Sequence, residues 1–145
     1  MKKIVINKCH GGFGLSLKAQ EEYLKLIGKK AYFYITSGYK HSDGVEEHKK
    51  ILAGSEKGSL FAHTLTKDFG ETFGEFGKDH NDNFFSDTEI ERDDLNLIDI
   101  VERLGEEASG SCAKLSIVEI PDDVKWVIDD YDGMESVEEA HRSWY

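Results

Sequence analysis

The sequence predicts one compact α+β domain over residues 1–145, with a mixed β-sheet of about four to six strands and about three or four short helices. Runs of β-branched and aromatic residues alternate with glycine-containing segments, which is typical of short strands and their connections. Two further segments space their apolar residues as amphipathic helices do. The chain has 39% hydrophobic and 32% charged residues and no linker-like stretch, which favours a single folded domain.

The first part of the chain is predicted to form a strand, a helix and a second strand, as a βαβ-like unit. The first strand spans residues 2–8, which contain a β-branched run. The helix spans residues 17–27, because Ser16 is a good N-cap and Gly28 can end the helix in the left-handed conformation. The second strand spans residues 31–36, which are rich in aromatic residues.

The middle of the chain is predicted to contain a short helix, a strand and an irregular loop. Asp43 and Glu46 have the spacing of a capping box, which indicates a helix over residues 44–53. Residues 59–66 are predicted to form a strand. Residues 68–77 mix phenylalanines with glycines, and we expect an irregular, aromatic-rich loop there.

The next segment contains the clearest helix signal. A strand is predicted over residues 83–90 and a helix over residues 94–104. Asp93 or Asp94 would cap this helix at its start, and Gly105 would end it.

The C-terminal part is predicted to form a hairpin and a last short helix. The hairpin would pair residues 113–120 with residues 124–128 across a turn at residues 121–123. The last helix would span residues 135–141.

The net charge of −11 is distributed unevenly along the chain. Residues 1–67 contain 12 lysines and 6 acidic residues, a net charge of +6, whereas residues 68–145 contain 6 basic and 23 acidic residues, a net charge of −17. The acidic part would repel phosphate backbones, so we expect no direct binding of nucleic acid through it. It would instead attract a basic surface of a partner, including one that normally holds nucleic acid, although acidic residues also serve simply to solvate exposed faces.

The sequence also indicates a cellular compartment. It has no apolar run of about 18 residues, so we expect no membrane span. Its first apolar run, Ile4 to Ile6, is too short for a signal peptide. Two cysteines do not make a disulfide framework, and a cytoplasmic location is the simplest expectation.

The glycine segment between the first strand and helix is a candidate ligand site. It has only part of a dinucleotide-binding motif, because Leu17 stands where the third glycine would be. Backbone amides at a helix start can still hold an anion. The candidate ligand-binding residues are Gly12, Gly14, Ser16 and, to pair a phosphate, Arg92. The alternative is a structural turn.

A metal site is a second candidate. Cys9, His10 and His80 have side chains that zinc prefers, but their spacing is not diagnostic. The alternative is that Cys9 is a small buried apolar residue and the histidines are surface groups. No catalytic constellation stands out, so we assign no catalytic residues; the sequence favours a protein that is not an enzyme and leaves an enzyme open as an alternative.

Two segments carry a family resemblance: KIVINKCHGGFGLS at residues 3–16 and AKLSIVEIPDDVKWVIDDYDGMESVEEAHRSW at residues 113–144. Together with RDDLNLIDIVERLG at residues 92–105, they resemble a family of small proteins found in phages, prophages and bacteria. The resemblance transfers no site residues. It implies a context in which small acidic proteins often antagonise host defence, anti-CRISPR proteins among them.

These observations lead to one main functional hypothesis and two alternatives. The main hypothesis is an inhibitor of a host defence protein, such as a CRISPR effector, that docks an acidic face on a basic channel and blocks its engagement of nucleic acid. The candidate partner-binding residues are Asp93, Asp94, Glu102, Glu106, Asp122, Asp123, Asp129, Asp130 and Asp132. The alternatives are a protein that binds or sequesters a nucleotide-type ligand and a metal-binding protein or metal-dependent enzyme, with zinc as the metal.

Overall fold

The computed structural model describes residues 1–40, 45–52 and 62–140, and it confirms the α+β class. The helices are α1 (Leu17–Leu26), α2 (Lys78–Asp82) and α3 (Leu95–Leu104), with 3-10 turns η1 (Asp87–Glu89) and η2 (Gly105–Ala108). The strands are β1 (Lys2–Asn7), β2 (Tyr32–Lys40), β3 (Val45–Ile51), β4 (Ala62–Leu65), β5 (Thr72–Phe73), β6 (Phe84–Phe85), β7 (Leu115–Ile120), β8 (Trp126–Tyr131) and β9 (Met134–Glu139). No helix in these ranges is long and apolar enough to cross a membrane.

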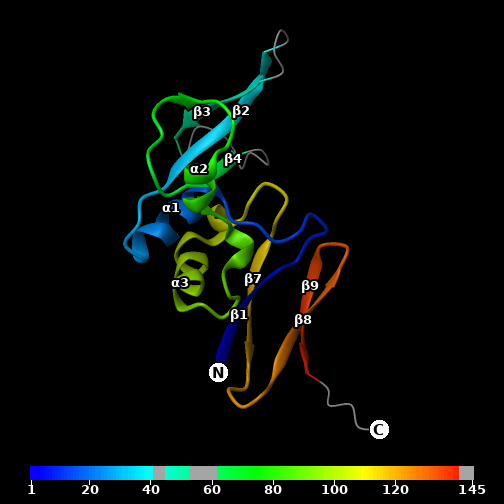
Figure 1. The fold of residues 1–145 in the computed structure, drawn as a ribbon. Helices are drawn as coiled ribbons and strands as arrows, with labels where there is room; N and C mark the ends of the chain where they lie inside the picture. Colours follow the sequence, from blue (N-terminus) through cyan, green and yellow to red (C-terminus); the bar gives the residue numbers. More distant parts are fainter. Residues whose placement is uncertain (41–44, 53–61, 141–145) are drawn as a thin grey trace.

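The described strands form three antiparallel sheets instead of the one mixed sheet expected from the sequence. One sheet has the strand order β5-β3-β2-β4-β6, a second pairs β1 with β7, and the third is the β8–β9 hairpin. The predicted βαβ-like unit is therefore wrong, because β1 and β2 lie in different sheets. Helices α1 and α3 lie between the five-stranded sheet and the β1–β7 pair, and the hairpin lies on the other side of β1 (Figure 1).

Strand β1 is buried on both faces, which explains its continuous apolar run. Val5 belongs to the apolar core that also contains residues of α1 and α3. Ile4 and Ile6 point to the opposite face of the strand, and they too are buried. Strand β9 contacts β1, so the hairpin covers part of this small domain's core.

Helices α1 and α3 begin where the sequence predicts. The side chain of Ser16 accepts a hydrogen bond from the backbone N–H of Ala19 at 3.1 Å. Asp94 is the N-cap of α3 and accepts from the backbone N–H groups of Asn96 and Leu97 at 2.8 and 3.1 Å. These caps satisfy backbone donors that have no partner within the helix.

The predicted helix over residues 44–53 is wrong in its described part, because residues 45–51 form strand β3. Strand β3 pairs with both β2 and β5, so long-range pairing overrides the local capping-box signal. Buried His48 lies within this strand. Residues 43 and 44, which carried the start of the predicted helix, lie outside the described residues.

The C-terminal hairpin has a different pairing from the predicted one. Strand β8 pairs with β9 across the two-residue turn Asp132-Gly133, whose φ angles are 53° and 87°. An Asp-Gly pair between two strands is a strong signal for such a turn. The predicted pairing of residues 113–120 with 124–128 and the predicted helix over residues 135–141 are therefore wrong in the described part.

The remaining strand predictions hold in part. The prediction over residues 59–66 is confirmed by β4, although residues 59–61 lie outside the described residues. The prediction over residues 83–90 is confirmed only at β6, after which the chain turns into η1. Residues 68–77 form the expected aromatic-rich loop, interrupted by the short β5.

Candidate functional site

The glycine segment that follows β1 lies where three parts of the chain meet. A Cβ atom on Gly11 would overlap the carbonyl oxygen of Cys112, and a Cβ atom on Gly133 would overlap the carbonyl oxygen of His10. The segment is therefore in direct backbone contact with the chain that enters β7 and with the turn of the β8–β9 hairpin. Gly11 of the segment and Gly133 of the hairpin turn are both needed for this close approach, which supports the structural-turn alternative.

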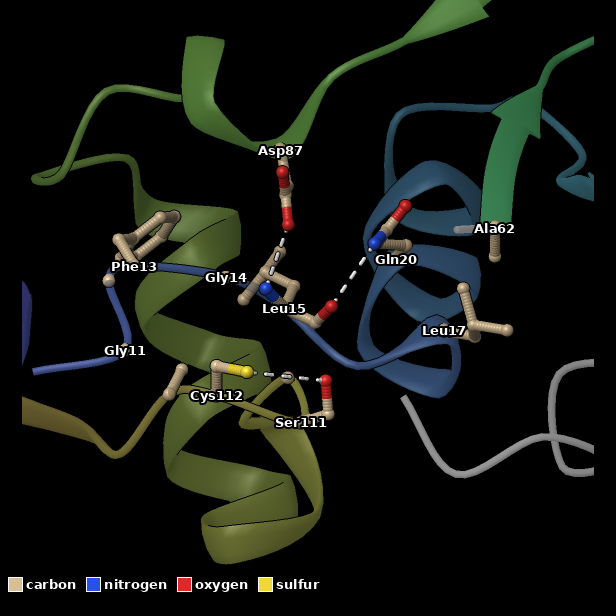
Figure 2. A pocket seen from close by; sticks show the side chains of 13 residues that line it. Gly11, Phe13, Gly14, Leu15, Leu17, Gln20, Ala62, Asp87, Ser111 and Cys112 are labelled. Atoms are coloured by element: carbon tan, nitrogen blue, oxygen red, sulfur yellow. Dashed lines mark hydrogen bonds between the residues drawn. The ribbon is translucent and has the colours of Figure 1, made fainter. Parts of the chain in front are cut away.

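A cavity of about 230 Å³ lies beside this segment. The glycine segment, the first turn of α1, η1 and the loop before β7 contribute to its wall (Figure 2). Gly12 and Gly14, which are candidate ligand-binding residues from the sequence, line it. Asp87 and Cys112 also line it, although neither is among the site residues predicted from the sequence.

The backbone amides beside the cavity already have hydrogen-bond acceptors. The N–H group of Leu15 donates to Oδ2 of Asp87 at 2.8 Å, and that of Ser16 donates to the carbonyl oxygen of Ala108 at 2.9 Å. The carboxylate of Asp87 puts negative charge where a phosphate was expected, and like charges repel. The cavity is also smaller than the roughly 300–1,000 Å³ typical of drug-sized ligands. This geometry argues against a nucleotide at Gly12, Gly14 and Ser16.

The cavity is held in place by polar contacts from α1 and β4. Gln20 donates through Nε2 to the carbonyl oxygen of Leu15 at 3.1 Å, and Thr64 donates to Oε1 of Gln20. Both Gln20 and Thr64 are buried. These contacts connect the glycine segment, which follows β1, to strand β4 of the five-stranded sheet.

Arg92 has a structural partner in place of the expected phosphate. Its Nη1 and Nη2 atoms donate to the two carboxylate oxygens of Glu135 at 2.6 and 2.9 Å. Nη1 also donates to the carbonyl oxygen of Val5 at 3.3 Å, and the guanidinium lies 3.6 Å from the ring centre of Phe13. The Arg92 side chain is 17% exposed and that of Glu135 is 5% exposed. The prediction that Arg92 binds a ligand therefore has no support from this geometry.

The three candidate metal ligands occupy two different neighbourhoods. The thiol of Cys9 donates to the carbonyl oxygen of Cys112 at 2.9 Å, and Nδ1 of His10 lies 3.3 Å from the carbonyl oxygen of Asp132. His80 instead lies in α2, with its ring against the aromatic loop at residues 68–77. Among the residues that the structure describes, no three potential metal ligands come together, so nothing here supports the expected zinc site.

His80 belongs to a cluster of stacked rings that the spacing of the sequence did not reveal. Its ring stacks on Phe69 and Phe73, with ring centres 4.2 and 4.3 Å apart. Phe73 also stacks on the buried ring of His48 at 4.6 Å. These contacts assign the aromatic residues of the loop to packing.

The candidate acidic residues are spread over several elements and along the length of β1. Asp122 lies 3.4 Å from the amino group of Met1, at the start of β1, whereas Asp132 lies beside His10, beyond the end of β1. A six-residue strand spans about 20 Å, so these carboxylates are widely separated. Glu102 pairs with Lys3 at 3.2 Å. Asp93, Glu106, Asp123, Asp129 and Asp130 are also exposed, in the α3 region and in the hairpin with its preceding turn.

Asp94 differs from the other acidic candidates because its interactions lie within the fold. Besides capping α3, it accepts a hydrogen bond from the hydroxyl of Tyr23 at 3.2 Å. Burial, together with the negative charge and the hydrogen bond of Asp94, raises the pKa of Tyr23 above its ordinary value. Asp94 therefore joins α1 to α3, and its carboxylate is not free to meet a partner.

Comparisons of this chain with protein-family models, curated proteins and solved structures found no match.

Proposed function

We propose that this protein is a non-enzymatic binding protein that docks the outer face of its β8–β9 hairpin on a basic surface of another protein. One observation carries this proposal: three large apolar side chains are exposed on that face, among carboxylates. Val127 is 48% exposed, Tyr131 is 78% exposed and Met134 is 40% exposed. Asp129 and Glu138 lie on the same face.

The strand register determines which side chains point outward. The pairs Val127–Glu138, Asp129–Ser136 and Tyr131–Met134 alternate with pairs that contain Glu135 and Ile128. Glu135 is buried against β1 and Arg92, so its face is the inner one. The opposite face is therefore directed away from the domain. On it, Tyr131 lies opposite Met134, and Val127 lies four residues away along β8, beyond the Asp129–Ser136 pair.

The charge of the hairpin and its preceding turn favours a basic partner. Residues 122–139 contain eight acidic residues and one lysine. Protein interfaces combine apolar side chains with polar and charged groups, and tyrosine and methionine are enriched among their apolar contacts. The carboxylates would speed encounter with a cationic surface and repel nucleic acid.

The class of partner follows from the same electrostatics. A basic protein surface that normally holds nucleic acid presents the complementary charge, and a protein docked there would block nucleic-acid binding. The resemblance to small phage and prophage proteins suggests a host defence protein, such as a CRISPR effector, as this partner. The protein would then act in the cytoplasm as an anti-defence inhibitor.

A competition experiment with a purified CRISPR effector tests the proposal. The fraction of labelled target DNA bound by the effector is measured as this protein is added, at two salt concentrations. We expect inhibition that weakens about tenfold or more in Tyr131→Ala, because exposed tyrosines at interface centres often carry much of the binding energy. Asp129→Lys should also weaken inhibition, with a larger effect at low salt.

Glu21→Lys is the matched control for the charge reversal. It makes the same change of charge on the exposed side of α1, far along the chain from the hairpin. Asp130 is less suitable for reversal, because its Oδ1 accepts a hydrogen bond from the N–H group of Gly133 in the turn. Equal inhibition by Asp129→Lys and Glu21→Lys would exclude the hairpin as the interface. Absence of inhibition for effectors with basic channels would exclude the partner class.

A further inference from the structure

The carboxylate of Asp87 is a negative charge at the wall of the cavity. One oxygen accepts a hydrogen bond from the N–H group of Leu15, which fixes the orientation of the side chain (Figure 2). In the described part of the chain, no lysine or arginine pairs with this carboxylate. Asp68 and Asp79 differ in this respect, because Lys50 and Lys67 pair with them at 2.5 and 2.6 Å.

The other groups at the cavity wall are neutral. Glycines contribute backbone without side chains, which keeps the space open. The hydroxyl of Ser111 and the thiol of Cys112 lie on the other side of the glycine segment from Asp87 (Figure 2). No lysine, arginine or histidine is among the described residues that line the cavity. The lining therefore offers hydrogen-bond acceptors and one net negative charge to a bound molecule.

The chemistry and the size of the cavity point to one class of ligand. A volume of about 230 Å³ suits a molecule smaller than the usual drug-sized ligand. A partly buried carboxylate is stabilised by a cation that also donates hydrogen bonds. We propose that this cavity binds a small organic cation, a guanidinium or primary ammonium group on a short chain, through the carboxylate of Asp87. This proposal is independent of the function proposed for the hairpin.

A pair of matched probes tests the charge selectivity. Methylguanidinium and N-methylurea have nearly the same shape and similar N–H donors, but only methylguanidinium is charged. Each is titrated into the protein while the backbone amide signals are followed by NMR. We expect methylguanidinium to give saturable shifts at Gly14, Leu15 and Gly110, and N-methylurea to give none that saturate.

Asp87→Asn tests the residue itself. Its amide oxygen can still accept from the N–H group of Leu15, so the local structure is kept while the charge is removed. We expect the affinity for methylguanidinium to fall by about tenfold or more, because hydrogen bonds to charged groups are the stronger ones. Asp82→Asn, which removes an exposed carboxylate outside the cavity lining, should keep the affinity of the unmodified protein.

Three outcomes would overturn the proposal. They are equal binding of the charged and neutral probes, unchanged affinity in Asp87→Asn, and no saturable shift with methylguanidinium. If Asp87→Asn does not fold, the two probes still decide the matter on the unmodified protein, because they differ in charge. Loss of the hairpin interface would not affect this result, so the two proposals can fail separately.

Discussion

Arg92 and Glu135 form a largely buried bidentate ion pair that attaches the β8–β9 hairpin to the rest of the domain. The two N–O distances are 2.6 and 2.9 Å. Oε1 of Glu135 also accepts a hydrogen bond from the N–H group of Asn7 at 2.8 Å, at the end of β1. One carboxylate thus connects β9, β1 and the segment before α3, and it orients the outer face of the hairpin.

We predict that Glu135→Ala lowers the free energy of unfolding by about 3–5 kcal/mol, because it leaves the largely buried guanidinium of Arg92 without its partner. Urea denaturation followed by circular dichroism measures this change. Asp99→Ala is the control, since it breaks the exposed pair between Asp99 and Arg103 and should cost roughly 0.5 kcal/mol or less. A similar cost for both variants would contradict a structural role for the buried pair.

We predict that Gly133→Ala destabilises the protein more than Gly28→Ala does. The two glycines have similar φ angles, 87° and 79°, so the left-handed conformation of an alanine costs about the same 1–2 kcal/mol at each position. Only at Gly133 would the added Cβ overlap the backbone of the glycine segment, whereas nothing lies within 4 Å at Gly28. Thermal unfolding compares the two variants. Equal losses would show that Gly133 is needed only for its turn.

We predict that Asp94→Ala lowers the free energy of unfolding by about 1–2 kcal/mol, because it removes the cap of α3 and the acceptor for Tyr23. Asp94→Asn should recover most of this stability, since its side-chain oxygen can still cap the helix. Chemical denaturation measures both. In the competition experiment, Asp94→Asn should inhibit as well as the unmodified protein does. Weaker inhibition by a stable Asp94→Asn variant would show that the carboxylate of Asp94 does contact the partner.

The sequence predicted those elements whose signals are local. Helices α1 and α3 begin at Ser16 and Asp94, and a helix cap lies within three residues of the groups that it binds. Strands β3 and β9 were missed because their polar sequences also suit helices and only their pairing selects a strand. The Asp132-Gly133 turn was a local signal that could have identified the hairpin.

The candidate sites were harder to predict, because the partners of their residues are distant in the sequence. Arg92 was expected to bind phosphate, yet its partner Glu135 lies 43 residues away. Asp87 was not singled out, because the N–H group that orients it belongs to Leu15, 72 residues earlier. The composition did predict an acidic surface, but only the strand register separates the outward carboxylates from the buried Glu135.

Asp68 and Lys50 provide a prediction about pH. The hydrogen bond from Lys50, at 2.5 Å, and that from the N–H group of Gly70, at 2.8 Å, lower the pKa of Asp68 below its ordinary value of 3.8. A carboxyl group with a lowered folded-state pKa stabilises the fold above its ordinary pKa. That contribution is lost as the pH falls through the folded-state pKa. The pair should therefore contribute to acid unfolding.

NMR titration of the aspartate carboxyl carbons checks this prediction. We expect the midpoint for Asp68 to lie below 3.8 in the unmodified protein and to rise toward 3.8 in Lys50→Met, because the largest cause of the shift is removed. Asp79 is an internal control, since the hydrogen bond that lowers its pKa comes from Lys67. Its midpoint should stay unchanged in Lys50→Met. If the midpoint of Asp68 does not change in Lys50→Met, the ion pair between Lys50 and Asp68 does not form in solution.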